Sequence, residues 1–285
     1  MSNISPAILA AYACTDPLEK ARLATKIYAD LSKGVYSHAA PIAIDLRPGR
    51  PARPELLDPR FVPRRRISKG KTGRIALLHA IAHIELNAID LSLDIAVRYT
   101  DYGLPFDFVW DWLSVASDEA RHFTLLHHRL EGLGSFYGAL PAHDGLWEAA
   151  VKTASDLAGR LAIAPLVLAA RGLDVTPQLI DKMREVEDED SAKILEIIMT
   201  DEVGHVGTGK RWFDYVCGCE RRDPISSWQS LVKQYFNGAL KPPFNIPART
   251  AARFSSAFYG PLAAEQARTE KAKTEQLRQN QPNQI

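Results

Sequence analysis

The sequence predicts an all-α protein built around a bundle of four long helices. Apolar residues recur at three- and four-residue steps over several long segments, which is the periodicity of amphipathic helices. No segment shows a convincing alternation of apolar and polar residues, so we expect no strands. An Asp-Glu-x-x-His motif occurs twice, at 118–122 and at 201–205, inside two of the helical segments.

Length, charge and cysteine content exclude several classes of protein. With 285 residues, the chain is long enough for one large domain or two small ones. Its 35 Lys and Arg residues nearly balance 34 Asp and Glu residues, so the net charge of +1 gives no general attraction to nucleic acid or membranes. Three cysteines do not suggest a disulfide scaffold, and no apolar run reaches the roughly 18 residues of a membrane span. The N-terminus lacks the pattern of a signal peptide, so we expect a cytoplasmic protein.

Composition divides the chain into three parts. Residues 1–72 form a helical lead-in followed by a Pro/Arg-rich arm, residues 73–220 hold the helical bundle, and residues 221–285 form a C-terminal helical extension with a polar tail. In the first part, Asp16-Pro17 is a typical helix start, because proline suits the first helical turn.

The arm, residues 41–73, contains six prolines, a density that prevents both a helix and a central strand. It is also rich in arginine and includes the run Arg64-Arg65-Arg66. Such an arm could contact an anionic partner, but it lacks the interleaved aromatic residues of single-strand binders. We expect extended chain that lines the domain surface and pairs with acidic helix faces, and we do not expect nucleic acid as a partner.

Glycine and proline positions set the ends of the bundle helices. The predicted spans, in order, are about 74–99, about 106–132 and about 146–171, then a short helix from Thr176-Pro177 to about 185, and a fourth long helix from the acidic stretch 185–190 to about 216. We expect Gly172 to end the third long helix. Beyond the bundle we expect short helices over 224–260, broken by prolines, and a frayed helix or tail over 264–285.

The two Asp-Glu-x-x-His motifs predict a metal site. In a helix, positions i and i+3 lie on one face, so Glu119 with His122 can hold one ion and Glu202 with His205 a second. Carboxylate-bridged di-iron bundles use this Glu-x-x-His pair on two helices and a lone Glu from each of the other two. A mixture of carboxylates and imidazoles suits iron or manganese better than zinc.

An aspartate precedes the glutamate in both motifs, as Asp118 and Asp201. A metal-bound His usually donates its other N–H to a carboxylate, which fixes the imidazole ring. We therefore expect Asp118 and Asp201 each to accept a hydrogen bond from the His of the opposite helix.

Glu85 is the candidate for a third carboxylate ligand. It lies on an otherwise apolar face of the first long helix, where a charge is costly unless it is paired. The turn near residue 102 is about equally far from Glu85 and Glu119. An antiparallel helical hairpin therefore places the two residues at the same height along the helix axes. The alternative is a Glu that only borders the core.

The fourth carboxylate is missing from its expected place. A count back from Glu202 over the length of the first hairpin ends at Leu168 or Ala169, neither of which binds metal. If the short helix after Thr176 folds aside, Asp156 becomes level with Glu202 and could supply the ligand. Otherwise one of the two metal positions is weaker than the other.

The other histidines are expected to have structural or surface roles. His79 and His83 precede Glu85 but lie on a different face, so we expect hydrogen-bonded structural or supporting roles for them. The remaining four are expected to be ordinary surface or loop residues: His38, His127, His128 and His143.

Five segments of the chain carry a family resemblance. They are HAIAHIELNAIDL (79–91), DWLSVASDEARHF (111–123), AHDGLW (142–147), ARGLDVTP (170–177) and ILEIIMTDEVGHVGTGKRWF (194–213). They resemble DUF455, a bacterial ferritin-like family of unknown function, over roughly residues 45–220. The resemblance implies a ferritin-like four-helix bundle with an N-terminal arm and extra C-terminal helices, and no known reaction. It puts five residues at the expected ligand positions: Glu85, Glu119, His122, Glu202 and His205.

The family pattern has a Glu at the position of Ala169 and a His at the position of Ser155. By this resemblance, the chain departs from its relatives at the ligand of the third helix. The departure argues against a symmetric di-iron centre.

Three functions remain open at this point. The first is a metal-dependent oxidoreductase, an oxygen-activating hydroxylase or oxidase of a small organic substrate. Its cofactor would be iron, as two ions, an iron/manganese pair or a single metal; its partners would be dioxygen and the substrate, with an electron-donor protein and a homodimer left open. The second is a non-catalytic ferritin-like binding module with a degenerate metal site. The third is iron storage or detoxification, which the arm and the extra helices disfavour because storage needs a closed shell of subunits.

Overall fold

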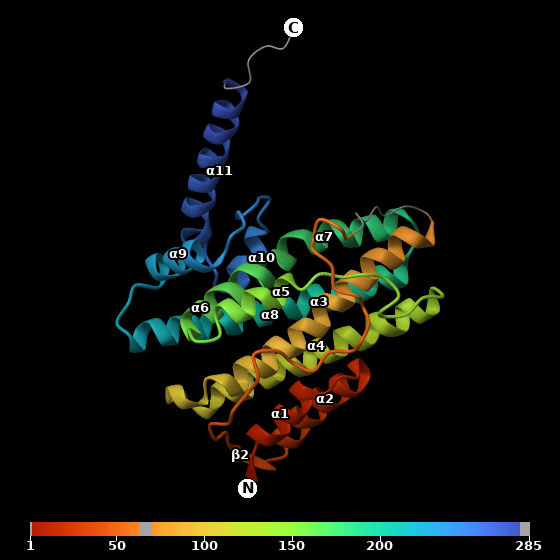
Figure 1. Cartoon of the computed structure of the whole chain (residues 1–285), viewed down its shortest axis with the longest axis vertical. Helices are drawn as coiled ribbons and strands as arrows, with labels where there is room; N and C mark the ends of the chain where they lie inside the picture. Colours follow the sequence, from red (N-terminus) through yellow and green to blue (C-terminus); the bar gives the residue numbers. More distant parts are fainter. Residues whose placement is uncertain (1, 63–69, 280–285) are drawn as a thin grey trace.

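The computed structural model describes residues 2–62 and 70–279, and helices dominate this part of the chain. The predicted all-α class is therefore confirmed (Figure 1). The expectation of no strands is wrong in one detail. Two very short strands, β1 (Ser2–Asn3) and β2 (Tyr36–His38), pair in parallel beside the first helices.

The N-terminal lead-in consists of α1 (Ser5–Ala13) and α2 (Pro17–Ser32). The Asp16 side chain caps α2 by accepting a hydrogen bond from the Glu19 N–H at 2.7 Å, which confirms the helix start expected at Asp16-Pro17. Helix α2 packs along α4 (Phe106–Gly132), so the lead-in covers one side of α4 (Figure 1).

The described part of the arm, up to residue 62, contains no helix and runs over the surface of the long helices, as predicted (Figure 1). Arg47 pairs with Asp144 at 2.5 Å, and Arg50 pairs with the buried Asp90 at 3.1 Å. These contacts agree with the expected pairing between arm arginines and acidic groups. The run Arg64-Arg65-Arg66 lies outside the described residues.

Three long helices agree with the predicted spans to within a few residues. They are α3 (Lys71–Arg98), α4 and α8 (Glu189–Cys219). The short η1 segment (Thr100–Tyr102) and Gly103, in the left-handed region at φ +68°, turn the chain between α3 and α4. Helix α3 packs along α4, and α4 packs along α8.

The third long helix differs from the prediction. In place of one helix over 146–171 the chain forms α5 (Gly145–Lys152), then α6 (Leu157–Ile163), the π-helical segment η2 (Ala164–Ala169) and α7 (Ala170–Glu185). The last three are continuous, so neither Gly172 nor the Thr176-Pro177 pair interrupts the helix. Helix α7 packs along α8.

A distant side chain explains why Pro177 is tolerated inside α7. Proline has no N–H, so the carbonyl four residues earlier, that of Leu173, loses its helical hydrogen-bond donor. The Asn245 side-chain amide supplies one at 3.0 Å. The helix therefore continues through a proline that, on local rules alone, marks a helix start.

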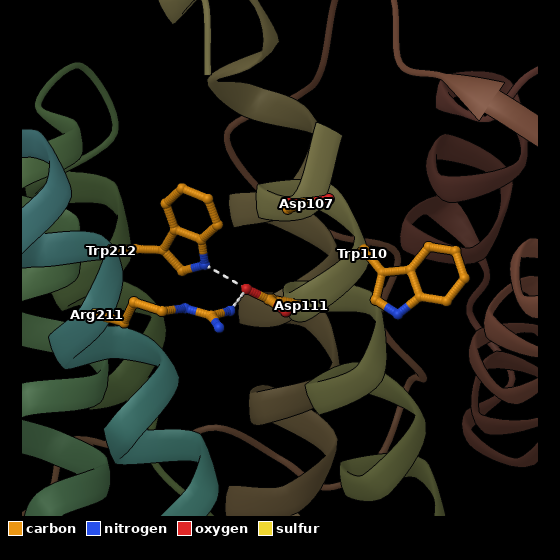
Figure 2. A pocket seen from close by; sticks show the side chains of 5 residues that line it. All are labelled: Asp107, Trp110, Asp111, Arg211 and Trp212. Atoms are coloured by element: carbon orange, nitrogen blue, oxygen red, sulfur yellow. Dashed lines mark hydrogen bonds and ion pairs between the residues drawn. The ribbon is translucent and has the colours of Figure 1, made fainter. Parts of the chain in front are cut away.

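Two polar contacts join α4 and α8 near the surface of the molecule. Asp111 of α4 accepts a hydrogen bond from the Trp212 indole N–H of α8 at 2.7 Å, and it also pairs with Arg211 (Figure 2). These residues line a surface hollow of about 340 Å³ together with Asp107 and Trp110. Because the Asp111 carboxylate already has both partners, we assign the hollow a structural role.

Buried ion pairs hold neighbouring elements to α3. Lys20 of α2 pairs with Asp90, and Arg160 of α6 pairs with Asp94. Lys20, Asp90, Asp94 and Arg160 are all almost fully buried. A buried charge is tolerated only when it is paired, so these contacts constrain how α2 and α6 lie against α3.

Within the described residues, three helices follow α8: α9 (Pro224–Tyr235), α10 (Ile246–Ala251) and α11 (Ser256–Gln279). The expected short helices over 224–260 are present as α9 and α10, whereas α11 begins at Ser256. Residues 264–279 of the predicted frayed helix or tail belong to α11, which projects from the body (Figure 1). Helix α9 packs on α6, where Trp228 is fully buried. Among the described residues, no helix combines the length and apolar character needed to cross a membrane.

Candidate metal centre

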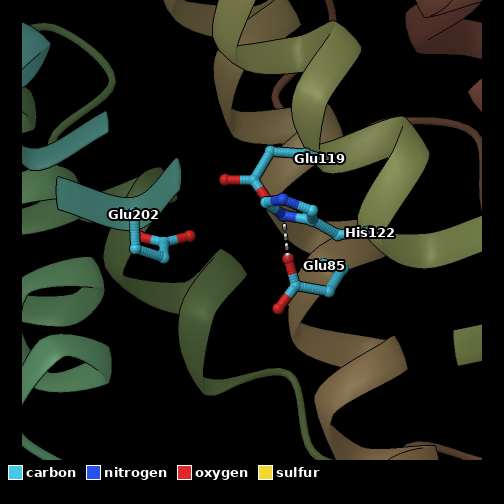
Figure 3. A group of neighbouring side chains, drawn as sticks. All are labelled: Glu85, Glu119, His122 and Glu202. Carbon is cyan, nitrogen blue, oxygen red and sulfur yellow. Dashed lines mark hydrogen bonds and ion pairs between the residues drawn. The ribbon is translucent and has the colours of Figure 1, made fainter. Parts of the chain in front are cut away.

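Three helices bring the predicted carboxylates together. Glu85 comes from α3, Glu119 and His122 from α4, and Glu202 from α8. One ligand atom of each lies within 4.8 Å of the corresponding atoms of the others (Figure 3). Glu85 therefore does more than border the core, because its carboxylate lies beside the residues of the first motif.

The two imidazoles lie on either side of Glu119. His122 Nδ1 is 3.2 Å from Glu119 Oε2 and 3.2 Å from Glu85 Oε2. His205 Nδ1 is 3.1 Å from Glu119 Oε1 and 3.4 Å from Glu202 Oε1. All five residues predicted as ligands thus form one group, with the Glu119 carboxylate between the two histidines.

The aspartates form the crossed pairs expected from the sequence. His122 Nε2 of α4 lies 2.8 Å from Asp201 Oδ2 of α8, and His205 Nε2 of α8 lies 3.4 Å from Asp118 Oδ2 of α4. Arg121 donates to Asp201 at 2.5 Å and to Asp118 at 3.5 Å, so it links the two pairs. With Nε2 facing an aspartate, Nδ1 of each ring faces the glutamates.

Arg121 was not singled out from the sequence, although a signal was available. It lies three residues after Asp118 on the same helix, which is the spacing at which side chains meet. Its guanidinium balances the two aspartates at the outer side of the group.

Burial makes the group electrostatically demanding. Glu85, Glu119 and His122 are at most 3% exposed. Burial and the neighbouring Glu119 carboxylate raise the pKa of Glu85 well above its ordinary value. Burial opposes ionisation of Glu119 too, but His205, His122 and a hydrogen bond from Glu85 outweigh it, so the pKa of Glu119 lies well below its usual range.

The imidazoles compensate this negative charge. Burial disfavours the charged form of His122, but its contacts with Glu119 and Glu85 prevail and raise its pKa to about 11. The same balance, with Glu119 and Asp118 as main partners, raises the pKa of His205 well above its ordinary value. When no metal ion is bound, protons on the imidazoles and on Glu85 must balance the charge of the three buried glutamates.

The surroundings of one carboxylate oxygen of Glu202 indicate whether a metal ion fits the group. Glu202 Oε2 is buried and has no hydrogen-bond partner within the part of the chain that the structure describes. A buried acceptor without a partner is costly and rare, and a cation would satisfy it. Three glutamates with two imidazoles are a donor set that suits iron or manganese. The residues present therefore fit a metal.

The third long helix supplies no ligand. Leu168 and Ala169, the residues found by counting along the sequence, lie at the end of η2 and line the cavity next to the glutamates. The alternative that Asp156 supplies the fourth carboxylate is wrong. Asp156 caps α6, where it accepts hydrogen bonds from the Gly159 N–H at 2.9 Å and the Tyr235 hydroxyl at 2.9 Å.

The ligand set is consequently asymmetric. Glu85, Glu119, His122 and Glu202 can surround one ion. The second position, at His205, has Glu119 and Glu202 within 3.4 Å but no carboxylate from the third helix.

A cavity of about 480 Å³ adjoins the glutamates, and most of its wall is apolar. Glu85, Glu119 and Glu202 form part of the wall, and the apolar part comes from α3, η2, α7, α8 and the segment after α9. Four of the six residues of the π-helical η2 line it: Ala164, Val167, Leu168 and Ala169. π-Helical turns are rare and occur often at functional sites, which agrees with this position.

His79 and His83 have the hydrogen-bonded structural roles expected for them, whereas His127, expected at the surface, is half-buried and its Nδ1 has no hydrogen-bond partner among the described residues. His79 Nε2 accepts a hydrogen bond from the Gly138 N–H at 2.9 Å. His83 Nδ1 lies 2.9 Å from the Tyr137 hydroxyl, and burial lowers the pKa of His83 to about 4. His38 and His128 are exposed.

Two comparisons place the chain among known sequences. A family model described as a protein of unknown function, DUF455, matches residues 13–260. A protein of Haemophilus influenzae, described as uncharacterized, is 38% identical over 250 residues, which cover 84% of this chain and 86% of that protein. No solved structure matches the chain. Because neither description carries an activity, only the side chains of the site indicate a function.

Proposed function

Because the chain belongs to the DUF455 family, whose description gives no activity, we propose its function from its own side chains: a metal-dependent oxidoreductase that uses dioxygen to hydroxylate or oxidise a small organic substrate. The observation that carries the proposal is the convergence of Glu85, Glu119, His122, Glu202 and His205 beside an apolar cavity.

The proposed architecture is a ferritin-like bundle formed by α3, α4, the continuous α6–η2–α7 segment and α8. Its support is the Glu-x-x-His pair on each of two helices and a lone Glu on a third, all directed inward. Ferritin-like di-iron proteins combine these elements with a second lone Glu, which this chain lacks at Leu168 and Ala169.

Each residue of the group has a distinct role in the proposal. Glu85 and His122 would hold the first ion and Glu202 and His205 the second, and Glu119 is available to both because it lies within 3.2 Å of both imidazoles. We propose two iron ions, with an iron/manganese pair or a single metal as variants. Iron held by such ligands would supply the reductive activation of dioxygen.

The protein itself binds and orients the substrate. The apolar wall next to Glu85, Glu119 and Glu202 excludes water and accommodates a carbon chain or ring. Hydroxylation of a C–H bond by one dioxygen molecule consumes two electrons and two protons and yields the alcohol and water. The proposal therefore includes an electron-donor protein as a partner.

A second candidate is a non-catalytic binding module. The missing carboxylate at Leu168 and Ala169 favours it, because one metal position is incomplete. In such a module the cavity would bind a ligand without turnover. The candidates differ in the effect of His122→Ala and His205→Ala, which abolish activity in an enzyme and leave ligand binding unchanged in a module.

Anaerobic titration with ferrous iron tests the proposal. We expect binding of close to two ions per chain and an absorbance change when oxygen is admitted. His122→Ala should reduce both signals, whereas His128→Ala, an exposed histidine on the same helix, should reduce neither. Failure of the protein to bind iron or manganese in stoichiometric amounts would reject the proposal.

A further inference from the structure

The cavity beside the glutamates has a second charged region. Its wall includes Arg171, Asp174, Lys241 and Arg249, which come from α7 and from the region after α9. Arg249 and Asp174 form a buried, two-pronged ion pair with distances of 2.8 and 2.7 Å. This pair is self-compensated, so the net charge of the region comes from Arg171 and Lys241.

Arg171 has hydrogen-bond donors to spare. Its guanidinium contacts the described residues through Nη1, which donates to the Lys241 carbonyl at 2.6 Å and approaches the Pro243 carbonyl and Asp174 at 3.4 and 3.5 Å. The side chain is 41% exposed, so Nη2 and Nε can reach a ligand. The Nη1 contact also holds the Lys241 backbone beside Arg171.

Lys241 is exposed and lines the same cavity, and its ammonium has no ion-pair partner within residues 2–62 and 70–279. Neither Arg171 nor Lys241 pairs with Glu85, Glu119 or Glu202, so the two cations do not neutralise the glutamates. The wall thus presents an acidic region and a separate basic region.

Apolar residues make up the wall around these two regions. On α7, the positions Gly172, Val175 and Leu179 share one face, and Arg171 lies at the edge of that face. A Cβ added at Gly172 would meet nothing within 4 Å, so this glycine leaves free space in the cavity. Phe236 and further apolar residues extend the wall near the cations.

From this arrangement we propose that the cavity binds an amphipathic anion, with its carboxylate or phosphate head on Arg171 and Lys241 and its apolar chain directed towards the glutamates. An anionic head is attracted by the two cations, and the wall nearer the glutamates offers mainly apolar surface to the chain, which sets the direction of entry. A guanidinium with free donors matches the geometry of carboxylate and phosphate oxygens. The inference builds on the proposed function, since it places a chain carbon, and not the head, beside the ligand residues.

Isothermal titration calorimetry with four probes of equal chain length tests the inference: decanoate, decyl phosphate, decanol and decylamine. We expect at least one anion to bind about tenfold or more tightly than decanol, the scale of one hydrogen bond to a charged group, and decylamine to bind most weakly. Comparison of decanoate with decyl phosphate distinguishes the two head groups. Equal affinities for the anions, decanol and decylamine would overturn the inference.

Variants locate the binding mode. The double variant Arg171→Gln/Lys241→Gln should lower the affinity for the anion to that for decanol and leave decanol binding unchanged. Lys193→Gln, an exposed lysine of α8 that does not line the cavity, is the matched control. Gly172→Leu fills free space and should weaken all probes. If the double variant binds the anion as tightly as the unmodified protein, the head does not bind at Arg171 and Lys241.

These titrations are independent of iron. A protein that binds the anion but no metal would support the ligand class and reject the proposed oxidoreductase. A protein that binds two metal ions but none of the anions would support the metal centre and reject the proposed ligand class.

Discussion

His122 Nε2 on α4 lies 2.8 Å from Asp201 Oδ2 on α8, and the reciprocal contact between His205 and Asp118 joins the same two helices at 3.4 Å. An aspartate that accepts a hydrogen bond from Nε2–H fixes the orientation of the ring, so that Nδ1 faces the glutamates and its lone pair can bind a metal ion that displaces the Nδ1 proton. Each motif therefore orients the ligand of the other helix, and the two helices must be correctly aligned before either imidazole is positioned.

The first prediction follows from this contact. Asp201→Ala removes the acceptor of His122 and should reduce the affinity for ferrous or manganous ions by about 10- to 100-fold. Asp118→Ala should have the smaller effect, because its contact with His205 is longer. Competition with a chromogenic chelator under anaerobic conditions measures both affinities.

Asp190→Ala is the control for this prediction, since Asp190 is an exposed aspartate of the same helix α8. Its affinity for metal should equal that of the unmodified protein. An Asp201→Ala protein with unchanged circular dichroism and unchanged metal affinity would show that the aspartate does not position His122.

The second prediction concerns two glycines of α8 with opposite surroundings. A Cβ at Gly209 would lie 2.3 Å from the Pro165 Cβ of η2, so α8 and the π-helical segment approach as closely as a glycine allows. Gly209→Ala should lower the free energy of unfolding by about 1–3 kcal/mol, because one element must move. Urea denaturation measures the change.

Gly204 is the matched counterpart. It lies in the middle of the same helix, is exposed, and a Cβ there would meet nothing within 4 Å. Gly204→Ala should raise the free energy of unfolding by about 0.5–1 kcal/mol through helix propensity alone. The same change in both variants would mean that α8 does not approach Pro165 as described.

The ligand residues were predictable from the sequence because the rules that relate them are local. The spacing of three residues puts Glu119 with His122 on one helix face, and the same rule applies to Glu202 with His205. The proximity of Glu85 to Glu119 was predictable because the turn near residue 102 is about equally far from both residues. The contacts of Asp118 and Asp201 with the histidines of the opposite helix could be predicted once the two motif helices were assumed to be neighbours.

The third long helix was predicted incorrectly because long-range contacts override its local signals. Pro177 reads as a helix start, but Asn245 supplies the donor that the Leu173 carbonyl lacks. Asp156 could be taken for a ligand, yet it caps α6 and binds the Tyr235 hydroxyl. The π-helical η2 and the cavity also depend on packing between segments far apart in sequence.

The third prediction is a pH dependence at Asp188, the cap of α8. Burial disfavours its charged form, but hydrogen bonds from Ser191, Arg129 and Arg74 outweigh this, so the pKa of Asp188 in the folded protein lies below the ordinary 3.8. The lowered pKa means that Asp188 contributes stability above pH 3.8 and that this contribution is lost as the pH falls through the folded-state value.

Asp188→Asn should therefore be less stable than the unmodified protein at neutral pH by about 1–3 kcal/mol, the cost of weakened hydrogen bonds to a charged group. The difference should shrink on acidification below about pH 4, near the ordinary pKa of an aspartate. Thermal unfolding over a pH series measures it, with Asp190→Asn as the exposed control. A stability difference that does not change between neutral and acidic pH would contradict the assignment.

The last prediction concerns a substitution that adds the carboxylate which the third long helix lacks. Ala169 lines the cavity with Glu119 and Glu202, so Ala169→Glu should place a further carboxylate next to the position of the second ion. We expect the second ion to bind about tenfold or more tightly, while the first is nearly unchanged because its ligands, Glu85 and His122, are retained. Stepwise anaerobic calorimetry resolves the two events.

The charge of the new side chain provides an internal check, and Ala169→Gln is the matched control of equal size. A fourth buried carboxylate increases repulsion in the metal-free protein, so Ala169→Glu should unfold at a lower temperature than Ala169→Gln without metal. Metal should reverse this order, because binding stabilises the folded state by an amount that increases with the logarithm of the affinity. Leu168→Glu tests the neighbouring position in the same way. Equal second-ion affinities for the Glu and Gln variants at both positions would mean that η2 does not face the second ion, and that the asymmetry of the centre has another cause.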